Sequence, residues 1–190
     1  MIFSPVTTNG KGKKVRTRMN FEQLITERYS VRNFKPEHLP QDVIDTILAA
    51  AHKAPTGCNF QPQRILVLNT DESIAKLRVC TKCHFGAPTA LLVCHNKDES
   101  WRRKYDGALS SPIDATIVAT FLMLAAQNEG VGSCWVMHFD PTAVREQFHI
   151  PQHIDPVALL VLGYPSDEAK PLELHYSVRP MEETVVYDSF

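Results

Sequence analysis

The sequence predicts one α+β domain in which short buried strands pack against helices. Apolar runs of strand length recur along the chain, and stretches with helical periodicity separate them. Neither an internal repeat nor a domain boundary interrupts this order. With 190 residues, of which 44% are hydrophobic, the chain is long enough to bury the core of one domain without disulfides or metals.

Four apolar runs are predicted strands, because aliphatic residues dominate each run and turn residues follow them. These runs are residues 64–68, 90–94, 133–137 and 156–162. A fifth β-prone stretch, residues 184–187, lies near the C-terminus.

Helices are predicted where apolar residues recur at helical spacing. They cover a short segment from Phe21 that ends before Tyr29, and residues 41–54, 71–79, 114–129 and 141–148. Asp140 and Pro141 are typical of an N-cap followed by proline at the first helical position. The helix at 114–129 is apolar nearly all round, which predicts a central or interface position.

The charge pattern does not favour nucleic acid as a partner. The net charge is −1, and the basic residues near the N-terminus form only a small cluster. Residues 1–18 show no sustained periodicity, so we expect a flexible N-terminal arm that is solvated.

The chain is expected to be cytoplasmic. Its first residues lack the apolar region of a signal peptide, and no apolar run approaches the roughly 20 residues that a membrane span requires. The five cysteines are an odd number, which favours a reducing compartment over a disulfide framework.

Residues 80–84 read CTKCH, which is the spacing of covalent haem attachment, and the cysteine pair could also begin a zinc site. A second C-x-x-C is missing, and haem attachment takes place outside the cytosol. The haem and zinc interpretations remain alternatives that an absorbance spectrum and metal analysis would test. Familiar nucleophile, phosphate-loop and zinc-protease motifs are also missing.

Three other segments suit a planar, anionic ligand. Residues 28–32 place two arginines and a serine on alternate positions, so their side chains can grip a phosphate or a polyol. Residues 54–62 offer backbone N–H groups and amides to a planar ring. Residues 130–137 contain two glycines that allow backbone to approach a ligand. Each segment also suits an ordinary loop, turn or helix cap.

Taken in order, these segments resemble the nitroreductase family of FMN-dependent oxidoreductases. RYSVR at 28–32 is similar to the R-x-S-x-R motif of that family, and APTGCNFQP at 54–62 is similar to its A-P-S-x-x-N-x-Q-P loop. Further similarity lies at residues 87–88, 105–107, 114–115, 130–135, 162–165 and 179–186. The resemblance covers about residues 20–190, which leaves 1–18 as the arm and makes 19–190 a single FMN-binding domain.

The resemblance implies a nitroreductase-like three-layer sandwich, with a central, mostly antiparallel sheet flanked by helices. It also implies an intertwined homodimer with C-terminal strand exchange and two FMN molecules at the interface. Residues 184–187 would then add a strand to the sheet of the partner, and the apolar helix at 114–129 would bury one side in the dimer.

The resemblance further implies a set of FMN-binding residues, some of them acting on the flavin of the partner. That set is Arg28, Tyr29, Ser30, Arg32, Pro55, Thr56, Asn59, Gln61, Trp135, Val136, Met137, His138 and Arg179. Arg28, Ser30 and Arg32 would hold the phosphate, the ribityl chain and the pyrimidine edge, and a backbone N–H after 134 would face flavin N5. Flavin N5 does the chemistry, so neither a catalytic side chain nor a metal is implied.

Two positions depart from the family pattern. His175 and Ser177 stand where many members carry a second basic residue, which leaves Arg179 to close the phosphate end. The linker between the second strand and the long helix is short, so the flavin face should be open, with Trp101 and Tyr105 as possible walls.

The implied activity is a ping-pong hydride transfer from NADH or NADPH to nitroaromatics, quinones or related electron-poor compounds. Alternatives are a specialised enzyme of the same family, dehalogenase-like or flavin-processing, and a non-catalytic flavin-binding protein. In this interpretation CTKCH becomes a loop beside the flavin. Cys80 and Cys83 would be buried or half-buried thiols, and Lys82 a second cation near the ring.

Overall fold

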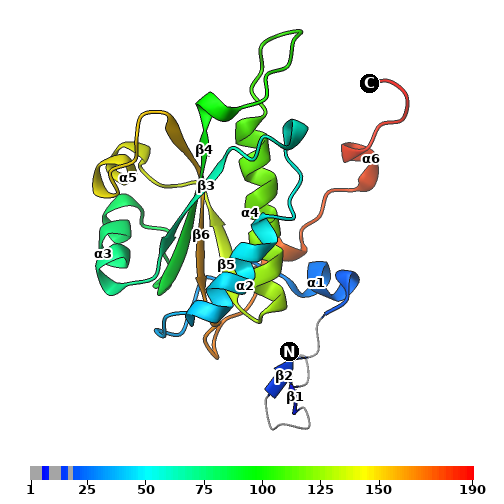
Figure 1. Cartoon of the computed structure of the whole chain (residues 1–190). Helices are drawn as coiled ribbons and strands as arrows, with labels where there is room; N and C mark the ends of the chain where they lie inside the picture. Colours follow the sequence, from blue (N-terminus) through cyan, green and yellow to red (C-terminus); the bar gives the residue numbers. More distant parts are fainter. Residues whose placement is uncertain (1–5, 9–13, 17–18) are drawn as a thin grey trace.

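The computed structural model describes residues 6–8, 14–16 and 19–190, and a four-stranded sheet forms its centre. The strands are β3 (Gln63–Leu68), β4 (Thr89–Asn96), β5 (Gly132–Val136) and β6 (Ile154–Gly163). Their order is β3-β4-β6-β5, and every neighbouring pair is antiparallel (Figure 1). The four predicted strands are confirmed, with ends that differ by no more than two residues.

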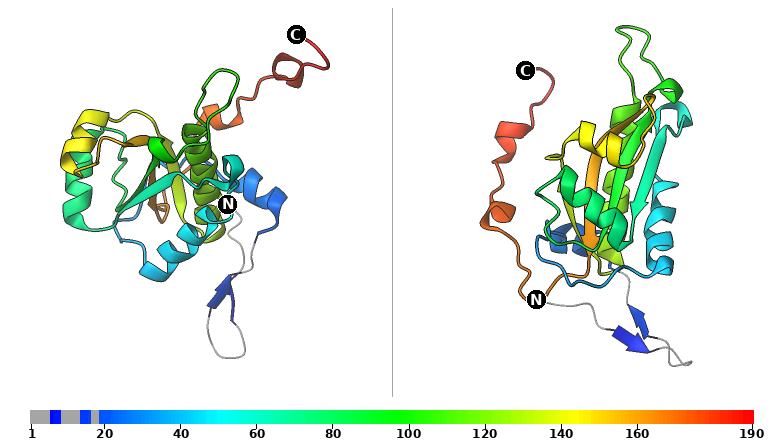
Figure 2. Two further views of the ribbon diagram at one scale, coloured as in Figure 1. Left: turned by 45° about the horizontal axis from the view of Figure 1, so that its top comes forward. Right: turned by 90° about the vertical axis from the view of Figure 1, so that its left-hand side faces the viewer.

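Helices cover both faces of the sheet and make three layers (Figure 2). α2 (Gln41–Ala51) and α4 (Ser111–Asn128) pack on one face, and α3 (Asp71–Cys80) and α5 (Pro141–Gln147) pack on the other. The buried side chains accordingly divide into two apolar clusters, one on each face of the sheet. The predicted α+β class is therefore confirmed.

All eight residues of β4 are buried, because alternate side chains enter the two clusters. Leu91 and Val93 face α2 and α4, whereas Leu92 and Cys94 face α3 and α5. Burying a leucine side chain fully contributes about 1.5–3 kcal/mol. A strand that is covered on both faces is encoded as a continuous apolar run rather than as alternation, which is the pattern ALLVC shows.

Two helix boundaries differ from the prediction by three residues, and three other helix ends by one. α2 ends at Ala51 rather than at residue 54, because a residue before proline avoids the helical conformation and Pro55 follows. The chain tightens there, since the N–H of Ala54 donates to the carbonyl of Ala51. α4 begins at Ser111 rather than at residue 114, with Pro112 in its first turn, where the missing N–H costs nothing.

Two short helices, α1 (Phe21–Glu27) and α5, begin at side-chain caps. Asn20 caps α1 in a reciprocal capping box with Gln23, and α1 contacts α4. Asp140 caps α5 as predicted, and its Oδ1 accepts hydrogen bonds from the N–H groups of Thr142 and Ala143.

The N-terminal segment contains a two-stranded ribbon, in which β1 (Val6–Thr8) pairs antiparallel with β2 (Lys14–Arg16). The rest of the predicted arm, residues 1–5, 9–13 and 17–18, lies outside the described residues. The flexibility of the arm therefore stays a prediction.

The C-terminal tail, residues 170–190, runs away from the body of the molecule (Figures 1 and 2). It contains a 3-10 turn, η3 (Glu173–Tyr176), and one helical turn, α6 (Met181–Thr184). The single chain does not form the predicted strand at 184–187, because Thr184 ends α6 and residues 185–187 join no sheet. A strand needs a neighbour for its backbone groups, and strand exchange with a partner stays a prediction.

Many large apolar side chains of the tail are exposed. They are Leu172, Leu174, Tyr176, Val178, Met181, Val185, Val186, Tyr187 and Phe190. Exposed apolar side chains in this number typically mark an interaction surface. Among the helices of the described ranges, none combines the length and the apolar content needed to cross a membrane.

Candidate functional site

The segment that follows α1 attaches to the edge strand of the sheet. Ser30 forms a parallel bridge with Ser133 at the start of β5, and the N–H of Val31 donates to the carbonyl of Ser133 at 2.9 Å. The Val31 side chain is buried in the cluster under α3 and α5, which fixes the segment against the sheet. Side chains alternate in direction along an extended segment, so those of residues 28, 30 and 32 point away from the side to which Val31 points.

The segment that follows α1 acts electrostatically on the thiol of Cys134 in β5. Burial raises the pKa of this thiol, while the positive charge of Arg32, a side-chain contact with Ser30 and the charge of Arg28 act in the opposite direction. Residues 28–32 therefore lie beside β5, and their role as a phosphate or polyol grip stays a prediction.

Neither guanidinium of this pair has an acidic partner in the part of the chain that the structure describes. Arg28 is half-buried, and its Nη1 approaches the sulfur of Met123 at 4.0 Å. Arg32 donates from Nη1 to the carbonyl of Ser30 at 3.2 Å, and its Cζ lies 5.7 Å from the ring centroid of Phe85. Two uncompensated cations make this edge of β5 suitable for an anion.

The end of β5 leads into a cavity of about 310 Å³. It is lined by residues 79–82 at the end of α3 and by residues 138–140, and the hydroxyl of Thr81 joins the two walls by donating to the carbonyl of His138 at 2.5 Å. Met137 and His138 are exposed here, as a ligand site requires. Lys82 contributes an exposed cation.

The CTKCH stretch therefore belongs to the wall of this cavity. Cys80 is buried and Cys83 is half-buried, as predicted, and burial raises the pKa of the Cys80 thiol. Among the residues that the structure describes, no group of three or more His, Cys, Asp or Glu side chains could hold a metal ion. Phe85, just after the stretch, is the residue that packs against Arg32.

Trp135 can contact a ligand at the edge of β5 through its backbone N–H rather than through its side chain. Its indole packs with the α2 and α4 cluster, whereas Cys134 and Val136 face the other side of the sheet. Since the carbonyl of Ser133 points outward to Val31, the two-residue period of an antiparallel strand also turns the N–H of Trp135 to the outer edge. That N–H can donate to a ligand at the edge of β5.

The loop at 55–61 has an unusual backbone. Cys58, Asn59 and Gln61 have φ values of +46°, +59° and +51°, a left-handed conformation that costs a non-glycine residue about 1–2 kcal/mol. The N–H of Gln61 donates to the hydroxyl of Thr56 at 3.1 Å, and both amide side chains are exposed. Such strain typically persists where surrounding contacts impose it.

Asp114, in the first turn of α4, anchors this loop at Gly57. This carboxylate is buried, with 3% of the residue exposed, and its Oδ1 accepts the N–H of Gly57 at 2.8 Å. Its Oδ2 accepts the hydroxyl of Ser110 at 2.8 Å. Sequence reasoning did not assign Asp114 a role in the site, although one carboxylate in a helix that is otherwise apolar was a usable signal.

The two groups of candidate residues lie at opposite ends of the sheet. Ser30 is bridged to Ser133 in β5. Across the sheet, Ser133 pairs with Leu162 of β6, and Leu162 pairs with Thr89 of β4. Ser30 therefore lies level with the start of β4. Because β3 and β4 are antiparallel, the start of β4 lies beside the end of β3. The loop at 55–61 lies at the opposite end, just before the start of β3. Five residues of strand at about 3.4 Å each separate the two levels by about 17 Å. One chain therefore does not bring these groups together.

Arg179 is also apart from the arginines that follow α1. It lies in the tail, where its Nη1 pairs with the carboxylate of Glu183 at 3.2 Å. The tail does touch the first group at another point, because the rings of Tyr29 and His175 meet edge to face with centroids 6.4 Å apart. Burial raises the pKa of Tyr29, which keeps its phenol protonated.

Comparisons with known proteins agree on one family. A family model described as Nitroreductase family matches residues 25–79 and 77–164. The crystal structure of a nitroreductase family protein from Clostridium difficile 630 is 38% identical and has a TM-score of 0.84, covering 90% of this chain and 100% of that chain. A Methanothermobacter thermautotrophicus protein, provisionally named NADH dehydrogenase/NAD(P)H nitroreductase, is 28% identical over 172 residues, 85% of each chain. An FMN reductase (NAD(P)H) of Bacillus subtilis is 23% identical over 76% of this chain and 66% of that protein.

Proposed function

Because this chain belongs to the nitroreductase family, we propose that it is an FMN-dependent oxidoreductase that uses NADH or NADPH. The nucleotide and an electron-poor acceptor, such as a nitroaromatic or a quinone, occupy the same face in turn in a ping-pong cycle. One observation carries the proposal. Arg28 and Arg32 flank Ser30 on the segment that is bridged to β5, and within the described residues neither has an acidic partner.

The chemistry of these residues fits FMN, which has an anionic phosphate at one end and a ring with a polar edge at the other. The half-buried Arg28 suits the phosphate, and Arg32 beside Phe85 suits the polar edge of a planar ring. The cavity lined by His138 lies at the end of β5, the strand to which this segment is bridged. When bound, FMN supplies a ring that accepts a hydride from the nicotinamide and passes electrons to the acceptor.

The residues of the chain orient the ligand and hold charge. Arg32 keeps a positive charge at the polar edge and stabilises negative charge that develops there. The N–H of Trp135 donates at the outer edge of β5. Cys134 stays a neutral thiol, because burial raises its pKa, so it adds no anion beside the two arginines.

We also propose that the protein works as a homodimer, with the loop at 55–61 of one chain covering the FMN that residues 28–32 of the other chain hold. The separation of about 17 Å within one chain supports this arrangement. The exposed apolar side chains of the tail support it as well, because a second chain would bury them. In that dimer Arg179 would exchange Glu183 for the FMN phosphate.

A cytoplasmic location completes the proposal. The cysteines of the chain are all free thiols in the structure, and an odd number of them suits a reducing compartment.

Spectroscopy of the purified protein tests the proposal. We expect a flavin band near about 450 nm, which bleaches when NADH or NADPH is added without oxygen and returns when a nitroaromatic or a quinone follows. Arg28→Ala and Arg32→Ala should each lose FMN on gel filtration, whereas Lys76→Ala, on the exposed face of α3, should retain it. A protein that binds no FMN on reconstitution would overturn the proposal. Bound FMN that neither nucleotide bleaches would indicate a carrier instead.

A further inference from the structure

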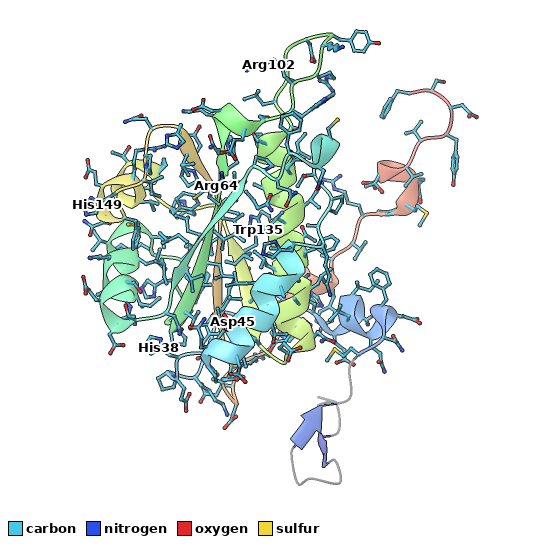
Figure 3. All side chains as sticks on the ribbon, viewed as in Figure 1. His38, Asp45, Arg64, Arg102, Trp135 and His149 are labelled. Atoms are coloured by element: carbon cyan, nitrogen blue, oxygen red, sulfur yellow. The ribbon has the colours of Figure 1, made fainter. Side chains whose placement is uncertain are left out.

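A hairpin projects from the end of the molecule that carries the loop at 55–61 (Figure 1). This cationic hairpin comprises residues 101–110, between β4 and α4, and Arg102 lies on it beyond the start of α4 (Figure 3). Arg102 and Leu109 form an antiparallel bridge, and the N–H of Arg103 donates to the carbonyl of Ala108 at 2.9 Å. Its own backbone pairing therefore gives the hairpin a defined shape.

The base of the cationic hairpin packs directly on the loop at 55–61. A Cβ added to Gly57 would lie 2.8 Å from the hydroxyl oxygen of Ser110 and 3.5 Å from Cβ of Trp101, so the two segments leave no room for a side chain. Asp114 binds both segments, since its two oxygens accept from Gly57 and from Ser110. The hairpin and the loop are thus held as one unit.

Positive charge gathers at the tip of the hairpin, where Arg102, Arg103 and Lys104 are consecutive and exposed. Arg103 forms a fork with Asp106, at 2.8 and 2.5 Å, and Arg102 donates from Nη1 to the carbonyl of Gly107 at 2.9 Å. Within the described residues, no contact engages the ammonium of Lys104. In a chain whose net charge is −1, this tip is a local cationic site.

Tyr105, the next residue, is 98% exposed. Its ring is a flat apolar surface that would be stabilised by stacking on another ring. A free ammonium beside an exposed aromatic ring suits a ligand that has an anionic group next to a planar base. The adenosine 2′-phosphate of NADPH has both, whereas the adenosine of NADH lacks the additional phosphate.

We propose that the tip of the cationic hairpin binds the adenosine end of the nucleotide and makes the enzyme prefer NADPH. Tyr105 stacks on the adenine, and Lys104 and Arg103 bind the 2′-phosphate. This assignment rests on the proposed function, because the nicotinamide must reach the ring that the loop at 55–61 covers. The four peptide steps from Trp101 to Tyr105 span at most about 14 Å, and an extended dinucleotide separates its two rings by a comparable length.

Four variants with FMN bound test the assignment through the ratio of kcat/KM for NADPH to kcat/KM for NADH. The wild-type ratio should exceed one, and Lys104→Ala should lower it about fivefold, the effect of one exposed ion pair. Asp106→Asn should raise it, because the substitution frees Arg103. Tyr105→Ala should lower both constants alike. Lys76→Ala removes the same charge from α3 and should leave the ratio unchanged.

Binding of 2′,5′-ADP and 5′-AMP, measured by calorimetry, gives a second readout that needs no turnover. The wild type should bind 2′,5′-ADP more tightly, and Lys104→Ala and added salt should both remove the difference. Equal reduction of the flavin by NADH and NADPH, or equal losses for both nucleotides in Lys104→Ala, would overturn the hairpin assignment alone. Bound flavin that neither nucleotide reduces would instead overturn the proposed function, and the calorimetry would still decide what the hairpin binds.

Discussion

Replacing Asp114 by alanine removes the carboxylate that joins the loop at 55–61 to the start of α4. The N–H of Gly57 and the hydroxyl of Ser110 would both lose a charged acceptor at 2.8 Å. Asp114→Asn is the matched control, because its side-chain oxygen can still accept from Gly57, and its amide can donate to Ser110.

The structure sets the magnitude of the Asp114→Ala effect. A hydrogen bond to a charged group contributes about 1.5–3 kcal/mol, and two are lost. Alanine also relieves the desolvation of a buried carboxylate, so we take the lower value for each bond and expect a loss of about 3 kcal/mol. In a protein of 150–250 residues, this corresponds to a fall in the unfolding temperature of about 6–12 °C.

Thermal and urea unfolding of the wild type, Asp114→Ala, Asp114→Asn and Ser110→Ala measure the effect. Asp114→Ala should be the least stable, and it should also release FMN faster, because the left-handed residues of the loop lose the contact that holds them. An unfolding temperature equal to that of the wild type would refute the reasoning. A Ser110→Ala loss as large as that of Asp114→Ala would show that the bond to Gly57 contributes nothing.

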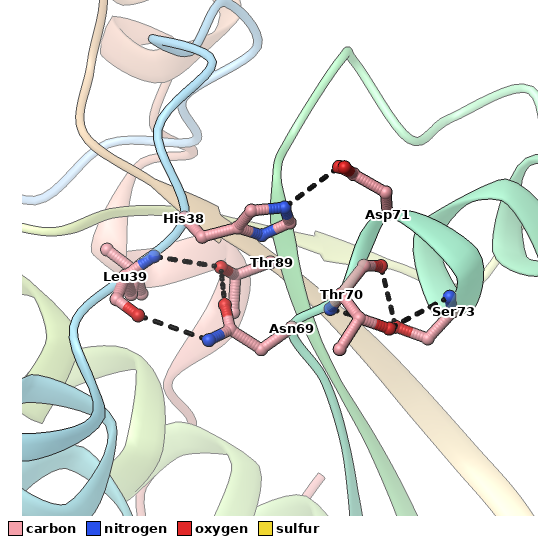
Figure 4. A network of polar contacts seen from close by, with 7 residues as sticks. All are labelled: His38, Leu39, Asn69, Thr70, Asp71, Ser73 and Thr89. Carbon is pink, nitrogen blue, oxygen red and sulfur yellow. Dashed lines mark hydrogen bonds and ion pairs between the residues drawn. The ribbon is translucent and has the colours of Figure 1, made fainter.

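Three further substitutions test the packing and the electrostatics. Gly132→Ala places a Cβ 2.7 Å from Cγ2 of the buried Val31, so urea unfolding should show a loss of about 1–3 kcal/mol, which Val31→Ala in the same chain should partly restore. Burial raises the pKa of Cys94 to about 12, so the unfolded chain ionises first as the pH rises above about 9. Stability should therefore fall by up to about 1.4 kcal/mol per pH unit between about pH 9 and 12, and Cys94→Ala should reduce this slope. Thr89 is fully buried, and its hydroxyl donates to Asn69 Oδ1 at 2.6 Å (Figure 4), so Thr89→Val should lose about 1–3 kcal/mol and Thr89→Ser much less. Equal thermal unfolding of these last two variants would contradict that account.

Much of the sheet could be predicted because its strands are buried on both faces. Such strands carry apolar residues without interruption, so ALLVC in β4 is visible without any knowledge of its neighbours. The cap of α5 was equally local, since Asp140 bonds to N–H groups two and three residues ahead. Structural features that depend on residues a few positions apart can therefore be predicted from the sequence.

The geometry of the site depends on contacts that are remote in the chain. Gly57 and Asp114 are far apart in sequence, and only the fold shows that one bonds to the other. Trp135 was expected among the FMN-binding residues, and only the register of β5 shows that its side chain faces α2 and α4 while its backbone lies at the outer edge. The tail was expected to add a strand, yet residues 185–187 need a second chain to pair with.

In the proposed homodimer, each chain would carry half of each of two sites, because its two candidate groups lie at opposite ends of one sheet. Two inactive parents should therefore complement each other in a hybrid dimer. If Arg32→Ala and Asn59→Ala subunits are mixed, one site of the hybrid receives both defects and the other receives neither. Activity should reappear on subunit exchange and rise towards a quarter of the wild-type value in an equal mixture, since half of the dimers are hybrids and half of their sites are intact.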